Sequence, residues 1–517
     1  MQEPRADSVA AGTEIELKLL FAENELPKIT ALVSKNAHQL KHRRLHTVYF
    51  DTGKHKLWKH GLTLRVRSTG DGYEQGIKRF QSSSVARNEW EEQIAGPGPD
   101  LLRLKASPIP EFASRYAEEG RLLPVFETGT DRITFALAGD KRLIEASIDR
   151  GEIKAGEAKL GICELELELK QGAVSDLFEL ASRFVAQALL RPDTISKAER
   201  GYLLAEGAWG RAAKGTKPRL DARMPSGPAF QEIFRTCLHD FNLNLPLIED
   251  IADVEGLHQG RIAIRRIRAA MTLFRPLVSD DAFRGLASEL KWLAGLLGAA
   301  RDLDVLLGHF ADCEANTGGN ARLREICCLA EARRLRARRA LVKSLDGKRG
   351  RALLLDLLAW IEAGQWRGQF AGAVQQPITG FARNRLKKRL SKLVKRGEDL
   401  ADLDAGARHK IRIEAKKLRY MAEFFGSARG VAKQPKQYKA MITCCEMLQE
   451  SLGAIRDQEA LDAFLRRELQ PHKGLEASRE PACAHRPGHR LRLQTANDME
   501  LTRAVKAYSE LAAVNPF

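Results

Sequence analysis

Over the first 205 residues, polar and apolar positions alternate with a period of two in short segments that Gly, Pro and Asp separate. This alternation is typical of β-strands with one buried face. Two stretches with helical spacing interrupt the strands, at residues 23–37 and 175–190. The predicted strands cover residues 13–21, 62–68, 74–80, 88–94, 131–137, 141–149, 151–157 and 163–170.

The pattern becomes helical after a segment rich in Gly, Pro and basic residues at 206–225, which we interpret as a linker. Amphipathic runs such as 288–310 and 351–363 have apolar positions three and four residues apart. The sequence therefore predicts an α+β multidomain protein. A β-rich domain at 1–205 precedes an all-α domain at 226–517.

Charge divides the chain in the same way. Residues 1–210 contain 30 Lys and Arg against 31 Asp and Glu, whereas residues 211–517 contain 54 against 36. The helical part should therefore prefer a polyanion, such as nucleic acid, an acidic membrane or a phosphate polymer. No apolar run approaches the roughly 18 residues of a spanning helix, and the N-terminus lacks the apolar core of a secretory signal. We expect a cytoplasmic protein without a membrane partner.

Charged residues occupy one face of several predicted strands. A sheet with one solvated face would explain any single strand of this kind. Some strands, however, present only carboxylates and others mainly Arg or Lys. The rows are Glu14, Glu16 and Lys18 in the first strand, Arg65 and Arg67 in the second, Arg87, Glu89 and Glu91 in the fourth, Glu145 and Asp149 in the sixth, and Glu164, Glu166 and Glu168 in the eighth.

An antiparallel sheet curled into a barrel would turn these rows into a charged lumen. Rows of carboxylates are what hard divalent cations require, and Mg²⁺ commonly bridges carboxylates to substrate phosphates. Arg and Lys rows would hold the phosphates, and phosphoryl transfer needs mainly such a clamp of metal and cations. The residues alone thus favour a metal-dependent site for a short, highly charged polyphosphate.

The order of these motifs resembles the CYTH, or triphosphate tunnel metalloenzyme, superfamily. Glu14-x-Glu16-x-Lys18 is followed by TVYFDTGKHKLWKHGLTLRVR, R-x-E-x-E, E-x-x-x-D-x-G, CELELE and SKAERGY, and together these cover residues 12–205. Within the superfamily the sequence is most similar to bacterial inorganic triphosphatases. The resemblance implies an eight-stranded antiparallel tunnel that binds Mg²⁺ or Mn²⁺ and hydrolyses tripolyphosphate to pyrophosphate and phosphate.

The resemblance also implies roles for individual residues. It places Gly76 where the family often has Thr, so a hydroxyl contact is expected to be missing. Arg200 is expected to close the tunnel through an ion pair as well as to lie near phosphate. The expected metal ligands are Glu14, Glu16, Asp149, Glu164, Glu166 and Glu168. The expected phosphate contacts are Lys18, Arg65, Arg67, Lys78, Arg87, Arg132, Lys197 and Arg200. The expected catalytic residues are Glu14, Glu16, Lys18, Lys78 and Lys197.

The helical region contains an internal duplication. His258 and His409 are each followed by basic residues at the same offsets of three, seven, eight and ten. Each motif is followed by a second match, at 296–306 and 452–461. We therefore predict repeats at about 226–375 and 376–517.

At 100° per residue, the histidine and the basic residues at offsets three, seven and ten share a stripe about 80° wide on each helix. A third basic helix is predicted at 381–397. A solvated basic face, or arginines paired to Asp302 and Asp457, would explain one such helix. Two matching stripes in a strongly basic domain favour a polyanion-binding surface.

This duplicated pattern resembles the CHAD domain, a helical domain with conserved histidines. The resemblance covers about residues 226–515 and implies two pseudo-symmetric helical bundles that bind inorganic polyphosphate. The sequence of this half lacks a Gly-rich phosphate loop and a cluster of metal ligands, so it is predicted to bind and not to catalyse. The expected polyphosphate contacts are His258, Arg261, Arg265, Arg266, Arg268, Arg301, Arg385, Arg389, His409, Arg412, Lys416, Lys417, Arg419 and Arg456.

Several alternatives stay open at this stage. The same tunnel could act on thiamine triphosphate or a nucleoside triphosphate, including by adenylate cyclase chemistry. The whole chain could instead be a non-catalytic protein of polyphosphate granules, although a pure anion binder gains nothing from a row of carboxylates. Specific nucleic-acid binding is disfavoured because the basic helices offer few aromatic side chains for base stacking.

Overall fold

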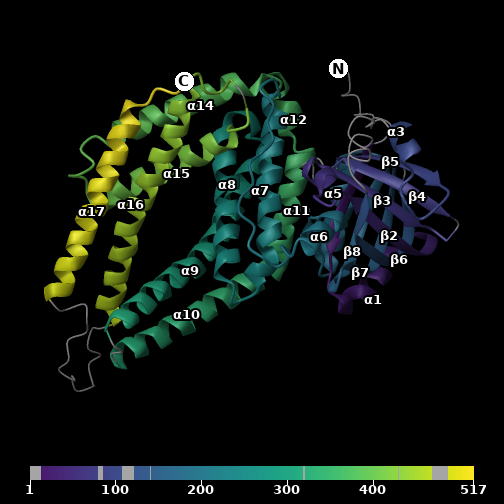
Figure 1. Ribbon diagram of the computed structural model, residues 1–517, viewed down its shortest axis with the longest axis horizontal. Helices are drawn as coiled ribbons and strands as arrows, with labels where there is room; N and C mark the ends of the chain where they lie inside the picture. The colour runs from purple at the N-terminus through teal and green to yellow at the C-terminus, as the bar shows by residue number, and fades with distance from the viewer. Residues whose placement is uncertain are drawn as a thin grey trace. The chain divides into compact units, whose positions relative to one another are not determined.

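The computed structural model describes residues 13–35, 37–70, 72–79, 86–106, 122–139, 141–317, 321–428, 430–468 and 487–517 (Figure 1). The chain forms two compact units. The first contains residues 1–213 together with two segments from later in the chain, 241–247 and 343–365. The second contains residues 214–240, 248–342 and 366–517.

The first unit is built on one antiparallel sheet whose strand order is β5-β4-β3-β2-β6-β7-β8-β1-β9. A further pairing between β5 and β1 closes the sheet into a barrel. The predicted antiparallel β tunnel is therefore confirmed. The strands are β1 (Thr13–Leu20), β2 (His38–Asp51), β3 (Leu62–Ser68), β4 (Tyr73–Arg79), β5 (Ala86–Ile94), β6 (Leu123–Gly139), β7 (Arg142–Ala155), β8 (Ala158–Gln171) and β9 (Arg191–Asp193).

The predicted number of eight strands is wrong, because the described residues form nine. The short strand β9 pairs with residues 18–20 of β1, while β8 pairs with residues 16–20. The two must therefore lie on opposite edges of β1. Since β5 pairs only with residues 13–15, it leaves the end of β1 available to β9.

Several strands also differ from the prediction, including β6 and β8, which begin at Leu123 and Ala158. The strand β2 was not predicted because its first half, HQLKHRR, lacks apolar alternation. The predicted strands 141–149 and 151–157 are one strand, β7, which continues through Gly151. A Cβ at Gly151 would lie 1.9 Å from the carbonyl oxygen of Gly129 on β6. Gly151 thus allows a close backbone approach and does not end the strand.

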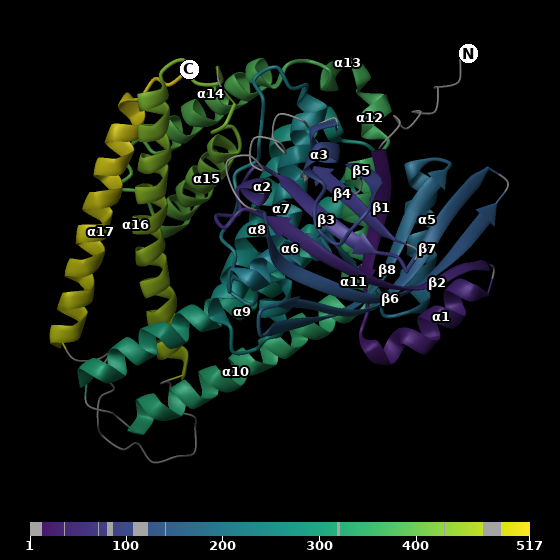
Figure 2. The same ribbon diagram turned by 45° about the vertical axis from the view of Figure 1, so that its right-hand side comes forward.

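The outer face of the barrel carries the apolar half of each strand. On β1, Leu17 and Leu19 are buried, and on β8 Leu165 and Leu167 are buried. The helix α5 packs against β8 (Figure 2) and supplies apolar residues such as Phe184 to this layer. The short helices of this unit are η1 (Glu23–Glu25), α1 (Leu26–Ser34), α2 (Lys56–Lys59), α3 (Leu101–Ala106), α5 (Val174–Gln187) and α6 (Lys197–Ala205), and α11 (Lys348–Ala363) packs on α5 and β9.

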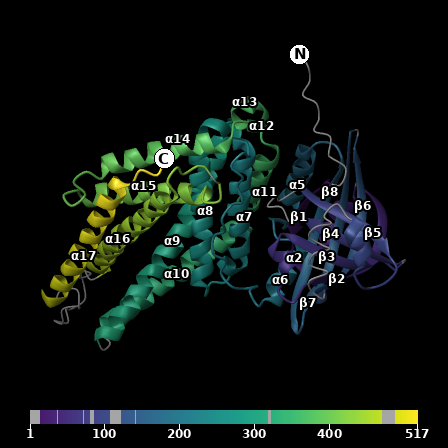
Figure 3. The same ribbon diagram turned by 45° about the horizontal axis from the view of Figure 1, so that its top comes forward.

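The second unit is helical, as predicted. Its long C-terminal helices α16 and α17 run side by side (Figure 3). Within the described residues, no helix combines the length and apolar character needed to cross a lipid bilayer. The helices are α7 (Ser226–Glu249, partly in the first unit), α8 (Val254–Val278), α9 (Asp281–Thr317), α10 (Ala321–Asp346), α12 (Trp366–Gln369), α13 (Ala371–Val374), α14 (Ile378–Arg396), α15 (Ala405–Phe424), α16 (Pro435–Glu468) and α17 (Pro487–Ala513).

The same local packing occurs in both halves of the second unit. A Cβ at Gly298 would lie 3.7 Å from Nη2 of Arg261, and a Cβ at Gly453 would lie 3.1 Å from Nη2 of Arg412. Each glycine precedes the Arg-Asp pair of its repeat by three residues. The two sequence motifs of each repeat therefore contact one another through a guanidinium that lies over a glycine.

Candidate active site in the β tunnel

The barrel encloses a cavity of 470 Å³ with charged walls. Because side chains alternate along a strand, the residues that face the cavity are the polar members of each strand. The cavity is lined by Glu14, Glu16, Lys18, Leu45, Thr47, Tyr49, Thr63, Arg65, Arg67, Lys78, Arg79, Glu89, Glu91, Thr128, Thr130, Arg132, Asp149, Glu166, Glu168, Lys170, Ser196, Lys197 and Ala198. The charged rows therefore line a lumen and not a solvated face.

Most of the carboxylates in the lumen are bound by a neighbouring cation. Along one part of the wall, Lys78 contacts Glu14 at 3.0 Å and Glu89 at 2.6 Å, and Glu89 in turn contacts Arg65 at 2.7 Å. Arg65 also binds Glu91. Opposite charges thus alternate from Glu91 to Glu14.

A second alternating run begins at Glu16. Lys18 contacts Glu16 at 2.6 Å and Glu166 at 3.6 Å. Arg132 binds Glu166 at 2.5 Å and Asp149 at 2.6 Å, the latter through two nitrogens. These ion pairs hold the carboxylates and cations of the two runs in place.

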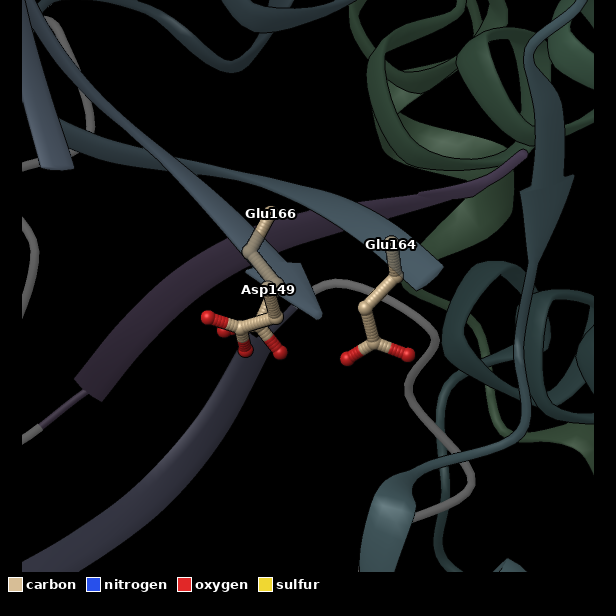
Figure 4. Close-up of side chains that lie close together, drawn as sticks. All are labelled: Asp149, Glu164 and Glu166. Carbon is tan, nitrogen blue, oxygen red and sulfur yellow. The ribbon is translucent and has the colours of Figure 1, made fainter. Parts of the chain in front are cut away.

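Asp149, Glu164 and Glu166 have carboxylate oxygens within 4.8 Å of one another (Figure 4), which is close enough to hold a metal ion. All three carboxylates are already bound by cations, however. Lys197 contacts Asp149 at 2.6 Å, Glu166 at 3.0 Å and also Glu164, and Arg200 binds Glu164. This acidic cluster therefore has its charge compensated by the protein.

Carboxylates also lie opposite one another where the two runs meet, although Glu168 contacts Lys170 at 2.5 Å. Strand register places Glu16 on β1 directly opposite Glu168 on β8, and Glu168 opposite Glu145 on β7. Like charges in opposed positions repel. Burial, with the nearby Glu14 and Glu145, raises the pKa of Glu168 to about 7 against the opposing effect of Lys170. Burial, with Glu16 and Glu89, also raises the pKa of Glu14.

This carboxylate row, which we define as Glu14, Glu16, Glu145 and Glu168, has the donor set that a hard divalent cation prefers. Mg²⁺ and Mn²⁺ take oxygen ligands, and a cation at the row would relieve the repulsion across the three strands. The residues present therefore fit the divalent metal that the resemblance to the CYTH superfamily implies. Glu14, Glu16 and Glu168 of the row contact Lys78, Lys18 and Lys170. Each carboxylate of the cluster around Glu164 contacts at least two cations, so the charge of the cluster is the more fully compensated.

The alternation of opposite charges is weakest at Arg67 among the tunnel arginines described above. Its pKa is lowered by burial and by the neighbouring cations Arg65 and Arg132. Its ion pair with Glu74 is long, at 3.9 Å, and its Nε donates to the hydroxyl of Thr47 at 3.3 Å. A buried guanidinium among other guanidiniums is a site that favours an anion.

The remaining residues predicted for the tunnel occupy distinct positions. Lys197 comes from the first turn of α6, whose N-terminus is capped by Ser196, and so enters the tunnel from a helix. Arg200 on the same helix is buried against Glu164, which agrees with its expected ion pair. The side chain of Arg87 lies outside the described residues.

Sequence reasoning assigned no site role to Glu89 and Glu91, which line the tunnel, or to Glu145, which lies opposite Glu168 in the sheet. Glu89 and Glu91 hold Arg65, and Glu145 completes the carboxylate row. A set of buried hydroxyls was missed because threonine in a strand signals only β propensity. The set is Thr47, Thr63, Thr128 and Thr130.

In the second unit the stripes of α8 and α15 interact with each other. Burial, followed by the charges of Arg265, Arg412 and Arg261, lowers the pKa of Lys416 to about 6. The pKa of Arg412 is also lowered, first by burial and then partly by Arg265 and Arg261 of the other stripe. The pKa of Arg261 is lowered first by burial and then partly by Arg265 of its own helix. The two stripes therefore crowd like charges into one region, which favours an anionic ligand.

Other predicted polyphosphate contacts have partners within the protein. Arg266 is buried and binds Asp240 at 2.6 Å. Arg419 binds Glu423 at 2.5 Å. The structure thus places both arginines in internal ion pairs, Arg266 off the stripe and Arg419 at its end.

The third basic helix, α14, contacts the opposite side of α15. Arg389 binds Glu414 at 2.6 Å, and Lys417 lies 3.4 Å from the same carboxylate. The pKa values of His258, His409, Arg268 and Arg385 are lowered, first by burial in each case and then by neighbouring cations. Arg301 and Arg456 belong to the stripes' surroundings, since they contribute to lowering the pKa values of the two histidines.

The comparisons with known proteins match a different family in each half of the chain. Residues 12–202 match the CYTH domain family, and residues 232–466 match the CHAD domain family. Over 198 residues the chain is 31% identical to an inorganic triphosphatase of Haemophilus influenzae, a match that covers 37% of this chain and 54% of that protein. The chain thus spans about half the length of this curated relative.

Two further similarities extend into the helical half. An uncharacterized protein of Mycobacterium tuberculosis is 25% identical over 425 residues, covering 77% of this chain and 79% of that one. The crystal structure of the CHAD domain from the plant Ricinus communis matches with a TM-score of 0.46 and 25% identity, covering 59% of this chain and 98% of that chain. The chain therefore combines a CYTH domain, at residues 12–202, with a CHAD domain, at residues 232–466.

Proposed function

We propose that this protein is a divalent-metal-dependent inorganic triphosphatase that cleaves tripolyphosphate to pyrophosphate and phosphate. The observation that carries the proposal is the presence of a crowded carboxylate row and a weakly paired arginine in one tunnel. A cation would relieve the repulsion among the carboxylates, and an anion would compensate the charge of Arg67. A metal-bound polyphosphate supplies both within one 470 Å³ cavity.

In this proposal, one set of tunnel residues binds the phosphates and another holds the metal ion. Arg67 and Arg132 bind phosphate oxygens on one wall, with the hydroxyls of Thr47 and Thr128 beside them. Glu14, Glu16 and Glu168 would hold Mg²⁺ or Mn²⁺ on the other wall, where the ion neutralises phosphate charge and orients the chain. These cations and hydroxyls are preorganised for charge that spreads over the phosphate oxygens in the transition state.

Three lysines hold the metal-binding and neighbouring carboxylates in position. Lys18 and Lys78 hold Glu16 and Glu14, and Lys197 bridges Asp149 and Glu166 beside Arg132. Similarity to the Haemophilus triphosphatase supports the same reaction class, although the match covers only half of that protein.

We also propose that the stripes of α8 and α15 bind inorganic polyphosphate. Arg261, Arg265, Arg412 and Lys416 crowd like charges together, and a polyanion relieves that repulsion. Binding of this kind releases counterions and weakens as salt concentration rises. Polyphosphate binding would locate the protein in the cytoplasm, including at polyphosphate granules.

The test is phosphate release from tripolyphosphate, ATP, thiamine triphosphate and long-chain polyphosphate, with Mg²⁺, Mn²⁺ or a chelator. Arg67→Gln is expected to lose about tenfold to a hundredfold in kcat/KM for tripolyphosphate, since it removes a charge-assisted phosphate contact. The matched control is Arg150→Gln, an exposed arginine of β7 that pairs with Glu23. Faster turnover of thiamine triphosphate or ATP would reassign the substrate. Absence of turnover with retained polyphosphate binding would make the chain a binding protein.

A further inference from the structure

Gly76 lies in the interior of β4, directly opposite Arg65 on β3 and Glu91 on β5. Glycine weakens a strand, because it has no side chain to pack and loses more conformational freedom on folding than any other residue. In a strand interior it marks a place where another group approaches closely. At Gly76 the approaching group is the side chain of Arg65.

The space above Gly76 is filled by the arginine. A Cβ at this position would lie 3.0 Å from Nε and 3.3 Å from Cγ of Arg65. The side chain of Arg65 therefore crosses β4 in contact with the glycine. It reaches β5 on the far side, where Nη2 donates to Glu89 at 2.7 Å and also to Glu91.

This path determines what Arg65 can offer to a substrate. Only 8% of the residue is exposed, and among the described residues its buried Nε has no hydrogen-bond partner. Its charge is balanced by two carboxylates. Arg67, two residues along the same strand face, lacks so close a balance.

We propose that Gly76 is a specificity-determining position of the tunnel. By leaving the space that Arg65 crosses, Gly76 keeps this arginine on Glu89 and Glu91 and away from the substrate phosphates. Arg65 is then a positioning residue of the wall, and Arg67, two residues along the same strand face, contacts the phosphates. The identity of the substrate in this inference rests on the proposed function.

The experiment compares Gly76→Val with Gly129→Val in the full chain. Gly129 is also a strand-interior glycine, but an added Cβ would meet nothing within 4 Å there. Gly76→Val should lower the melting temperature and push Arg65 into the lumen, which lowers KM for tripolyphosphate at least threefold without raising kcat. Gly129→Val should leave KM unchanged and not lower the melting temperature.

A double-mutant cycle decides whether Gly76 acts through Arg65. In an Arg65→Gln background, Gly76→Val should lower neither KM for tripolyphosphate nor the melting temperature. An unchanged KM in the single variant, or equal effects in both backgrounds, would overturn the proposal. If the wild-type protein hydrolyses nothing, the proposed function fails separately. Calorimetric Kd values for tripolyphosphate then replace KM in the same cycle.

Discussion

Single residues in the tunnel differ in role according to their neighbours. Arg65 and Arg67 are two positions apart on one face of β3. Arg65 is bound by Glu89 and Glu91, whereas burial beside Arg65 and Arg132 lowers the pKa of Arg67. The same residue type therefore braces the wall at one position and is available to an anion at the next.

The carboxylate row yields a prediction about metal binding. Glu168→Gln should weaken Mn²⁺ binding at least about tenfold, because it removes a charged oxygen ligand. Without metal, the variant should be slightly more stable, by about 0.2–1 kcal/mol, since Glu168 opposes Glu16 and Glu145. Calorimetric titration with Mn²⁺ and thermal unfolding measure the two effects. Glu152→Gln, on an exposed glutamate paired with Lys154, is the control, and equal Mn²⁺ affinities would place the metal elsewhere.

Lys416 yields a prediction about pH. Its pKa is about 6 in the folded protein and about 10.4 when unfolded, so between these values only the unfolded state is protonated. Stability should therefore rise with pH across this window, and Lys416→Met should remove that part of the rise. A bound polyanion raises the pKa again, so binding should take up protons and strengthen as pH falls from 8.5 to 6.5.

Two measurements check this behaviour. Polyphosphate titrations in buffers of different ionisation enthalpy measure the proton uptake, and urea unfolding at several pH values measures the stability. Affinity that is independent of pH in the wild type, or an identical pH profile in Lys416→Met, would contradict the assignment.

At the scale of elements, the helices α8 and α15 separate two functions onto two faces. One face carries the crowded cations of the stripe. Off the stripe, Arg266 binds the buried Asp240, and Glu414 binds Arg389 of α14. Helical periodicity thus lets one helix hold the bundle together and present charge at the same time.

This separation predicts different outcomes for two arginines of α8. Arg266→Gln should lower the free energy of unfolding by about 3 kcal/mol, because it leaves Asp240 buried without its charge partner. Arg261→Gln should leave unfolding nearly unchanged and weaken polyphosphate binding. The slope of log K against log salt should fall by about one in Arg261→Gln, because one phosphate fewer is neutralised by the protein. Urea unfolding and salt-dependent titrations distinguish the two variants. A stable Arg266→Gln with weakened polyphosphate binding, or an unstable Arg261→Gln with normal binding, would contradict the assignment.

At the scale of the whole molecule, a tunnel with charged walls is joined to a helical domain that carries two basic stripes. Binding of a long chain by one domain raises the effective concentration of its phosphoanhydride ends for the other, provided that the linker permits both contacts. The two domains can then cooperate without any direct coupling of their structures.

The expected consequence is a selective effect on long substrates. Arg261→Gln combined with Arg412→Gln should raise KM for long-chain polyphosphate several-fold and leave KM for tripolyphosphate unchanged. Steady-state kinetics on both substrates with the full chain tests this. Equal KM changes for the two substrates, or none for either, would mean that the domains act independently.

Much of the fold could be predicted from the sequence, because alternation and helical spacing are local signals. Strands β1, β3, β4 and β8 and the helical character of the second half follow from them. The strand β2 did not, since its polar first half is stabilised by pairing with β6 and not by its own pattern. The glycine in β7 looked like a strand end because its reason for being there, the backbone of Gly129, lies on another strand.

The sequence by itself determined which chemical groups are present and how they repeat. Glu14, Glu16 and Lys18 lie on one strand face, and two helices carry the same basic stripe. Only the tertiary structure decided which of these charges are compensated, because compensation depends on distances across strands and helices. Register opposes Glu16 to Glu168, and a glycine lets Arg65 reach β5. Electrostatic energy depends on spatial separation, and sequence spacing supplies that separation only within a single helix or strand.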